Sequence, residues 1–351
     1  MAPILKPDLC VIGGGSGGLT TAAAAAAFGV KVVLIERGKM GGDCLNYGCV
    51  PSKALIAAAK HAHAIEEAKR FGVFAEAPRI DFSAVKDHVA GVIAAIAPND
   101  SVERFESLGV TVIEADAAFV DEKTVSAGGR IIQARRYVVA TGSSPFVPPI
   151  EGLADIAYFT NETIFDLRER PGHLVIIGGG PIGMEMAQAH QRLGSKVTVL
   201  EAGALLGRDD PELAAVVIER LRAEGVVLRD HAKVVGVAAG EVGPSIIVET
   251  DEGRETIAAS HLLVAVGRAP NVHGLGLEAA GVEYGPKGIK VGTDLRSTNR
   301  RIYAVGDIAG GPQFTHVANY QAGLVLRPIL FRLPVRECRD HLPHVTFTDP
   351  E

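Results

Sequence analysis

The hydrophobic and polar positions of the chain repeat one pattern twice. An apolar run that starts at Leu9 leads into a glycine-rich loop, an alanine-rich helical segment and a second apolar run ending at Glu36. The same order returns between Leu174 and Glu201. Short apolar runs joined by a glycine loop and a helix are typical of buried parallel strands. The pattern therefore predicts two α/β units built on one plan.

The two glycine loops stand at the same distance from the acidic residue that closes each unit. Glu36 follows Gly13 by 23 positions, and Glu201 follows Gly178 by 23 positions. Such glycines allow a tight turn, close approach of the backbone to a pyrophosphate and close packing of the helix, while the acid accepts hydrogen bonds from a ribose. Glycine turns that bind no ligand are the alternative, but two matched copies favour two nucleotide sites. The predicted loop residues are Gly13, Gly15, Ser16, Gly17 and Gly18 in the first unit and Gly178, Gly180, Pro181, Ile182 and Gly183 in the second.

Shorter apolar runs and prolines predict where the units end. Strands are expected at 137–140 and 262–266, and the proline-rich run 143–149 is expected to be an unpaired linker because proline cannot continue a strand ladder. A further strand at 302–305 predicts that the chain returns to the first domain after the second. The predicted fold class is α/β, with two Rossmann-like dinucleotide-binding domains and the second inserted in the first. The expected boundaries are 1–149 and 268–339 for the first domain, 150–267 for the second, and 340–351 for the start of another.

Composition narrows the class of protein further. The chain has 351 residues, more than one hydrophobic core usually organises, and 47% of them are apolar. A net charge of -6 removes the electrostatic basis for tight binding to nucleic acid or to an anionic membrane. The most apolar early stretch, 19–35, contains Gly29 and Lys31 and fits a packed helix plus strand better than a membrane span or signal peptide. A cytoplasmic enzyme is expected.

Two of the four cysteines, Cys44 and Cys49, stand five positions apart. Four cysteines are too few for a disulfide scaffold in a chain of this length, so a close pair is more typical of redox or metal chemistry. A bridge between them needs a bent or helical segment that brings their Cα atoms within about 7 Å. A metal half-site or two buried thiols are the alternatives, but no further Cys or His stands at ligand spacing, so no metal site is predicted. Cys10, in the first strand, is expected to be a small buried residue.

The thirteen residues from Gly41 to Lys53 resemble the class I pyridine nucleotide-disulfide oxidoreductases, which include dihydrolipoamide dehydrogenase, glutathione reductase and mercuric reductase. Further motifs of that family follow in its order at 140–142, 266–271 and 303–307, and the resemblance covers nearly the whole chain. It implies a flavoenzyme that passes electrons between NAD(H) and a dithiol or disulfide substrate. FAD is the implied relay, and the implied redox centre is a Cys44–Cys49 disulfide, with Cys49 beside the flavin and Cys44 exchanging with the substrate.

The same resemblance implies roles for other residues. Glu36 and the first loop would hold the adenosine diphosphate part of FAD, Asp307 the ribitol chain, and Lys53 and Glu185 would form an ion pair beside the flavin. Further FAD contacts are expected at Arg37, Gly42, Asp43, Lys53, Ala117, Thr141, Gly142, Ser143 and Thr315, and NAD contacts at Glu201, Val234 and Gly267. The carboxylate of Glu201 would repel the 2′-phosphate of NADP, and no arginine lies between it and Gly207, so NAD is favoured.

Two departures from the family pattern limit the functional expectation. Asp43 stands where the family commonly has threonine, which places a carboxylate next to the first cysteine. Residues 346–351 resemble the opening of a dimerisation domain that carries the acid-base histidine of the family, so a truncated piece of a homodimeric protein is expected. His316, His341 and His344 are accordingly expected at a surface or interface, and no histidine of this chain is assigned that role.

The substrate and the use of the cysteines stay open at this point. Dihydrolipoamide is the favoured substrate, followed by a mercuric-reductase-like or another disulfide-reductase activity. A redox-inert FAD- and NADH-binding fragment is the alternative outside enzyme chemistry. An NADH oxidase or quinone-type reductase that does not use its cysteines is the other enzymatic alternative.

Overall fold

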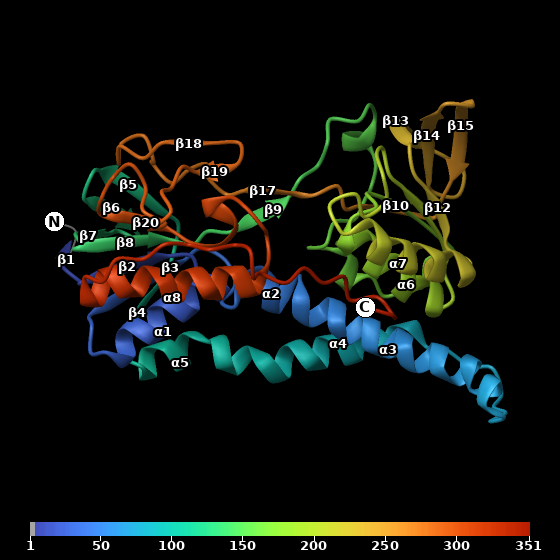
Figure 1. Ribbon diagram of the computed structural model, residues 1–351, viewed down its shortest axis with the longest axis horizontal. Coiled ribbons are helices and arrows are strands. Elements are labelled where there is room, and N and C mark those ends of the chain that lie inside the picture. Colours follow the sequence, from blue (N-terminus) through green and yellow to red (C-terminus); the bar gives the residue numbers. More distant parts are fainter. Residues whose placement is uncertain (1–3) are drawn as a thin grey trace. The chain divides into compact units, whose positions relative to one another are not determined.

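The structure, a computed structural model, describes residues 4–351 and divides into two compact units (Figure 1). Unit 1 comprises the chain up to Asn46, Ala94–Ser144 and Arg268–Leu342, and unit 2 comprises Tyr47–Ile93, Pro145–Gly267 and Pro343–Glu351. These units differ from the domain boundaries expected from the sequence, because residues 47–93 group with the second unit. Each unit carries one of the two glycine loops.

Unit 1 is built on a five-stranded parallel sheet in the order β20-β8-β2-β3-β4. Its strands are Ile302–Ala304, Arg136–Val139, Leu9–Ile12, Val32–Glu36 and Thr111–Glu114 in that order. The apolar run of β2 is buried along its whole length, as expected for an inner parallel strand. Helix α1 (Ser16–Ala27) joins β2 to β3 and lies beside α8 (Thr315–Phe331) (Figure 1). The expected strands near 137–140 and 302–305 are therefore confirmed within one residue.

Smaller elements complete unit 1. A four-stranded sheet has the order β1-β7-β6-β5, and β18 pairs with β19. Tyr137 of β8 is fully buried; its hydroxyl accepts from the Ala134 N–H and donates to the Lys123 carbonyl oxygen, which ties this small sheet to the main one. The remaining bounds are β1 Ile4–Leu5, α2 Gly42–Asn46, η2 Ala97–Asp100, α5 Val102–Ser107, β5 Ala117–Asp121, β6 Thr124–Ala127, β7 Arg130–Ile132, β18 Tyr284–Gly285, β19 Gly288–Ile289 and η5 Gly306–Ala309.

Unit 2 repeats the plan with a four-stranded parallel sheet in the order β12-β11-β10-β16. Its strands are Val227–Arg229, Lys196–Leu200, His173–Ile177 and His261–Val264 in that order, and α6 (Pro181–Arg192) joins β10 to β11. In both units the strand before the glycine loop pairs on one side with the strand after the helix and on the other with a later, closing strand. This confirms the predicted α/β class with two Rossmann-like units. The remaining bounds are η3 Leu153–Asp155, η4 Ile164–Asp166, α7 Pro211–Ala223, β13 Lys233–Ala239, β14 Pro244–Thr250 and β15 Gly253–Ala258.

Two helices that precede the second glycine loop belong to the core of unit 2. They are α3 (Cys49–Glu67), continued by η1 (Ala68–Phe71), and α4 (Phe82–Ile96). Leu55 of α3 and Phe82 of α4 are buried in one apolar cluster with Leu174 and Met184. This packing explains why residues 47–93 belong to unit 2 although they precede its glycine loop in the sequence.

The predicted linker at 143–149 is partly a strand. Ser143–Pro145 form β9, which pairs with β17 (Arg268–Pro270). The expectation of an unpaired linker was therefore wrong at its first three residues, because Pro145 lies at the end of the strand, where a missing N–H donor interrupts little.

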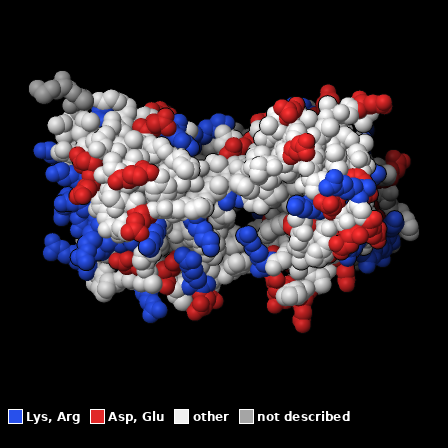
Figure 2. All heavy atoms as spheres, turned by 90° about the horizontal axis from the view of Figure 1, so that it is seen from above, with Lys and Arg blue, Asp and Glu red and all other residues white. Residues whose placement is uncertain are grey.

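The surface carries charges of both signs. On the face shown in Figure 2, Lys and Arg side chains are interspersed with Asp and Glu over both units. Among residues 4–351, no helix is long and apolar enough to cross a membrane.

Candidate functional site

The first glycine loop turns sharply at the end of β2. Gly13 has a φ of +111°, and a Cβ atom there would lie 2.3 Å from the Ala140 carbonyl oxygen. A Cβ on Gly18 would lie 1.8 Å from the Gly13 carbonyl oxygen, so only glycine lets α1 pack this close to the strand. The helix begins at Ser16, directly after the turn, and its first N–H groups have no partner within the helix. This end of α1 is suited to an anion.

The second loop has the same geometry in unit 2. Gly178 has a φ of +112°, and its Cβ atom would lie 2.4 Å from the Ala265 carbonyl oxygen. A Cβ on Gly183 would lie 2.0 Å from the Gly178 carbonyl oxygen, whereas a Cβ on Gly180 would meet no atom within 4 Å. The open space at Gly180 allows a pyrophosphate to approach the backbone. Residues in both units therefore fit a dinucleotide.

The acids that close the two repeats, Glu36 and Glu201, hold the loops in the same way. Glu36 accepts hydrogen bonds from Gly14 N at 2.5 Å and from Gly38 N at 2.6 Å. Glu201 accepts from Gly179 N at 2.7 Å and from Gly203 N at 2.9 Å.

Both carboxylates thus lie beside the glycine loop, at the carboxyl end of the strand that follows the helix of each repeat: β3 for Glu36 and β11 for Glu201. That is the position from which an acid contacts the ribose of a nucleotide.

Other predicted FAD residues gather at the same edge of the sheet in unit 1. A Cβ on Gly42 would lie 2.7 Å from the Gly15 Cα atom, so Gly42 closes directly over the loop. Ser143 Oγ donates to Asp307 Oδ2 at 2.5 Å. Burial raises the pKa of Asp307, while Ser143 and Arg268 act in the opposite direction. A half-buried carboxylate with only part of its hydrogen-bonding capacity used is suited to accept from a hydroxylated ligand.

Arg268 links three predicted FAD residues, although the sequence had assigned it no role. Its Nη2 donates to Asp43 Oδ1 at 3.0 Å and to the Ser143 carbonyl oxygen at 2.7 Å, and its Nε lies 3.9 Å from Asp307 Oδ2. The Arg268 side chain is only 10% exposed. The charge of Asp43, which departs from the family pattern, is therefore balanced by a largely buried cation. The signal in the sequence was the position of Arg268 in the motif at 266–271.

The two predicted redox cysteines belong to consecutive helices of the chain. Cys44 is in α2 of unit 1, and Cys49 is the first residue of α3 in unit 2; both are half-buried. Their pairing stays a prediction. Cys10 is fully buried, as expected, and burial raises its pKa.

The ion pair expected from the resemblance is present within unit 2. Lys53 Nζ of α3 donates to Glu185 Oε2 of α6 at 2.8 Å, and the Glu185 side chain is 8% exposed. Glu185 Oε1 accepts from Phe347 N at 2.9 Å, a contact that sequence reasoning missed because the two residues are 162 positions apart. The location of this pair beside a flavin stays a prediction.

The remaining predicted residues occupy separate places. Asn271 holds the end of β8: its Nδ2 donates to the Thr141 carbonyl oxygen and its N–H to that of Gly142. Arg37 lies near Asp116 on the surface, Ala117 is buried at the start of β5, Val234 is buried in β13, Gly267 has a φ of +130°, and Thr315 begins α8. His316, His341 and His344 are exposed.

Over residues 4–351, no group of three or more His, Cys, Asp or Glu side chains is placed to hold a metal ion.

Comparison with known proteins adds independent observations. The model of a family described as Pyridine nucleotide-disulphide oxidoreductase matches residues 7–322. The chain is 38% identical to a mercuric reductase of Streptomyces lividans, over 98% of this chain and 74% of that protein. It is 35% identical to a mercuric reductase of Bacillus cereus, over 98% of this chain and 55% of that protein. It is 34% identical to a dihydrolipoyl dehydrogenase of Geobacillus stearothermophilus, over 99% of this chain and 74% of that protein.

A solved structure has the same fold. The HOCl-induced flavoprotein disulfide reductase RclA from Escherichia coli superposes with a TM-score of 0.85 at 29% sequence identity, covering 98% of this chain and 76% of that one. The chain thus spans between about half and three quarters of the length of the relatives it matches.

Proposed function

Because the chain belongs to the pyridine nucleotide-disulphide oxidoreductase family, we propose that it transfers electrons between a pyridine nucleotide and a dithiol or disulfide substrate through FAD and a Cys44–Cys49 disulfide. The observation that carries the proposal is the repeated loop-and-acid geometry, since each copy fits one dinucleotide. The first copy, with Gly42 closed over its loop, leads directly into the segment that holds both cysteines.

The residues of the chain would divide the work as follows. The first loop and Glu36 bind the adenosine part of FAD, Asp307 accepts a hydrogen bond from its ribitol chain, and the second loop with Glu201 binds the nicotinamide nucleotide. FAD, when bound, supplies two-electron transfer between the nicotinamide and the disulfide.

The disulfide step balances with one proton. Oxidation of NADH to NAD⁺ releases two electrons and a proton, and with these the S–S bond of Cys44 and Cys49 opens to one thiol and one thiolate. The Cys44 thiolate would then attack the substrate disulfide to form a mixed disulfide and release one substrate sulfur, and Cys49 would displace the other as the Cys44–Cys49 bond re-forms, so that the single proton of the cysteine pair leaves with the reduced substrate. Dihydrolipoamide would be oxidised by the reverse sequence.

Thiol counting tests this proposal. We expect anaerobic NADH to release two new thiols per chain, and Cys49→Ser to abolish that release. Cys338→Ser, a change at an exposed cysteine outside the predicted pair, is the matched control and should leave the release at two.

No new thiols would instead support a redox-inert FAD- and NADH-binding fragment. Full activity of Cys44→Ser with the physiological acceptor would support an oxidase or quinone-type reductase.

The preferred nucleotide is proposed to be NAD. Both oxygens of Glu201 are already engaged with main-chain N–H groups, so its charge is held at the position that a 2′-phosphate would approach. We expect kcat/KM for NADH to exceed that for NADPH by at least about tenfold, corresponding to roughly 1.4 kcal/mol. Equal values for the two nucleotides would contradict this assignment.

Dihydrolipoamide is the proposed substrate, with Hg(II) as the second candidate because relatives of both names match the chain to a similar degree. Steady-state rates with lipoamide, glutathione disulfide and Hg(II) distinguish the candidates. We further propose that the protein is a cytoplasmic homodimer.

A further inference from the structure

A short segment close to Glu351 contacts the Lys53–Glu185 pair and touches both helices that carry it, α3 and α6. We define this segment, residues 347–350, as the strap. We propose that the strap is a positioning element that fixes the Lys53–Glu185 pair, with Phe347 as its principal positioning residue. The inference rests on the proposed function, because it concerns the ion pair expected beside the flavin.

Phe347 contacts both members of the pair. Its N–H donates to Glu185 Oε1 at 2.9 Å, while Lys53 Nζ donates to Glu185 Oε2 at 2.8 Å. Lys53 Nζ also lies 4.3 Å from the centroid of the Phe347 ring. The carboxylate is therefore held at both oxygens, and the ammonium group lies between a carboxylate and an aromatic face, two favourable contacts for a cation.

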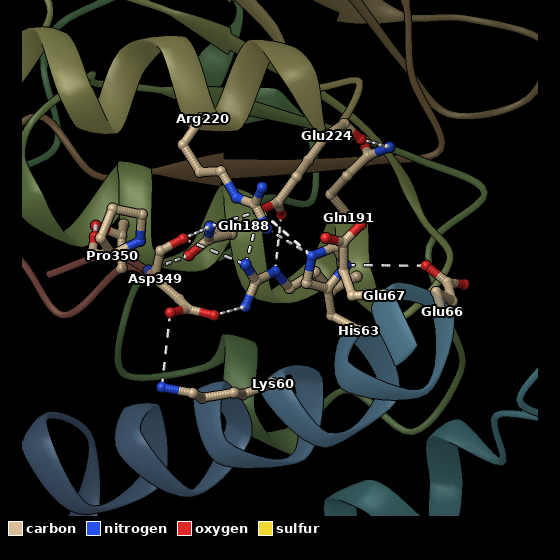
Figure 3. A network of polar contacts seen from close by, with 12 residues as sticks. Lys60, His63, Glu66, Glu67, Gln188, Gln191, Arg220, Glu224, Asp349 and Pro350 are labelled. Atoms are coloured by element: carbon tan, nitrogen blue, oxygen red, sulfur yellow. Dashed lines mark hydrogen bonds and ion pairs between the residues drawn. The ribbon is translucent and has the colours of Figure 1, made fainter. Parts of the chain in front are cut away.

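Asp349 anchors the other end of the strap to α6, the helix that carries Glu185 (Figure 3). Its N–H donates to Gln188 Oε1 at 2.8 Å, and Gln188 Nε2 donates to its carbonyl oxygen at 2.9 Å. Arg192 Nη1 donates to Asp349 Oδ2 at 3.0 Å, and Lys60 of α3 lies 3.6 Å from Oδ1. Glu185, Gln188 and Arg192 are three and four positions apart in α6, so one face of that helix binds the whole strap.

The anchor is itself rigidly held. Arg192 Nε and Nη2 donate to the two oxygens of Glu224 at 2.7 and 2.6 Å, and the two side chains are only 3% and 6% exposed. Arg220 contacts the same carboxylate at 2.6 Å. Thr348, between the two contact points of the strap, is buried. Since buried charged networks tolerate little rearrangement, a displacement of the strap is passed to Glu185 and Lys53.

The first test measures the acetylation rate of Lys53 by competitive labelling and mass spectrometry, on the protein with and without FAD. The Glu185 carboxylate and the Phe347 ring both shield the Lys53 amine. Phe347→Leu keeps the apolar bulk but removes the aromatic face, so it should raise the acetylation rate about two- to fivefold. Phe347→Tyr keeps the face and should match the parent protein. Gln188→Leu, which removes two anchoring hydrogen bonds, should also raise the rate.

Lys290 is the internal control for each variant. It pairs with Glu283 at 2.9 Å in unit 1, and its labelling should stay constant. Phe347 is 38% exposed, so its variants should fold even if Gln188→Leu does not. Unchanged Lys53 labelling in folded Phe347→Leu would overturn the proposal.

The second test is the affinity of the FAD-loaded protein for sulfite, which reports positive charge beside the flavin. Phe347→Leu should weaken it about two- to fivefold, and faster labelling with unchanged sulfite affinity would overturn the positioning role. Thiol release by NADH is measured on the parent protein. Absence of thiol release would contradict the proposed disulfide reductase activity. The rate of Lys53 labelling tests only the role of the strap.

Discussion

Asp307 is a single residue at which folding and ligand binding make opposing demands. Burial raises the pKa of its carboxyl above the unfolded value of about 3.9, and the opposing effects of Ser143 and Arg268 do not cancel the shift. The folded state therefore keeps the proton to higher pH than the unfolded state does. The stability that this group contributes is present below about pH 4 and is lost as pH rises through its folded pKa.

We therefore expect Asp307→Asn to be more stable, relative to the parent protein, at pH 7 than at pH 4 when FAD is absent. The same variant should bind FAD more weakly, because the amide is a poorer acceptor for a ribitol hydroxyl. Urea unfolding of the FAD-free proteins at the two pH values measures the first effect, and flavin titration measures the second. An equal stability difference at both pH values would contradict the prediction.

The glycine loops allow a matched test at the scale of the element. A Cβ on Gly183 would overlap the Gly178 carbonyl oxygen, whereas one on Gly180 enters open space. We expect Gly183→Ala to destabilise unit 2 by about 1–3 kcal/mol or more, since this is the typical cost of the backbone shifts that such overpacking forces. Gly180→Ala should unfold at the same denaturant concentration as the parent and bind NADH at least about tenfold more weakly, by obstructing the pyrophosphate. The prediction fails if the two variants are equally stable.

Helix α4 is fixed to unit 2 through a buried lysine. Lys86 is only 2% exposed; its Nζ donates to the Ile164 carbonyl oxygen at 3.0 Å and lies 5.3 Å from the Phe165 ring centroid. Burial lowers its pKa to about 8, while the nearby Asp166 acts in the opposite direction. Because the unfolded value is about 10.4, the unfolded state binds more protons between these values, and stability rises with pH across that interval.

Lys86→Met should remove this pH dependence. We expect the parent protein to gain roughly 2–3 kcal/mol relative to the variant between pH 7 and pH 10.5, since one pKa unit corresponds to about 1.4 kcal/mol. Chemical denaturation of both proteins at the two pH values measures the difference. Parallel curves for parent and variant would show that Lys86 is charged to the same extent in both states.

At the scale of the whole molecule, unit 2 depends on a chain segment that precedes its glycine loop. Leu55 and Phe82 contribute to the same buried cluster as Leu174 and Met184. A fragment of residues 145–267 therefore lacks part of its core, and we expect it to bind an apolar dye and to unfold at lower denaturant concentration than the whole chain. A cooperatively folded fragment with the midpoint of the whole chain would contradict this division.

The features that sequence analysis predicted are mostly local. The turn at Gly13 and the acid at Glu36 follow from chemistry within one strand-loop-helix unit, and the structure shows both. The contacts of Phe347 and Lys86 could not be predicted, because their partners are 162 and 78 positions away. No periodicity marks such pairs. The Lys53–Glu185 pair, 132 positions apart, was expected only because the family resemblance supplied it.

The interrupted path of unit 1 has a consequence for synthesis on the ribosome. The second sheet is complete when Val264 emerges, but the first sheet waits for β20 at Ile302–Ala304, and α1 waits for α8. At about 5–20 residues per second, the edge of β8 is left without its neighbour for on the order of 10 s while the inserted unit is translated. The unit that the ribosome starts first thus completes its main sheet after the inserted unit has completed its own, and its nascent apolar surface is what a chaperone would meet.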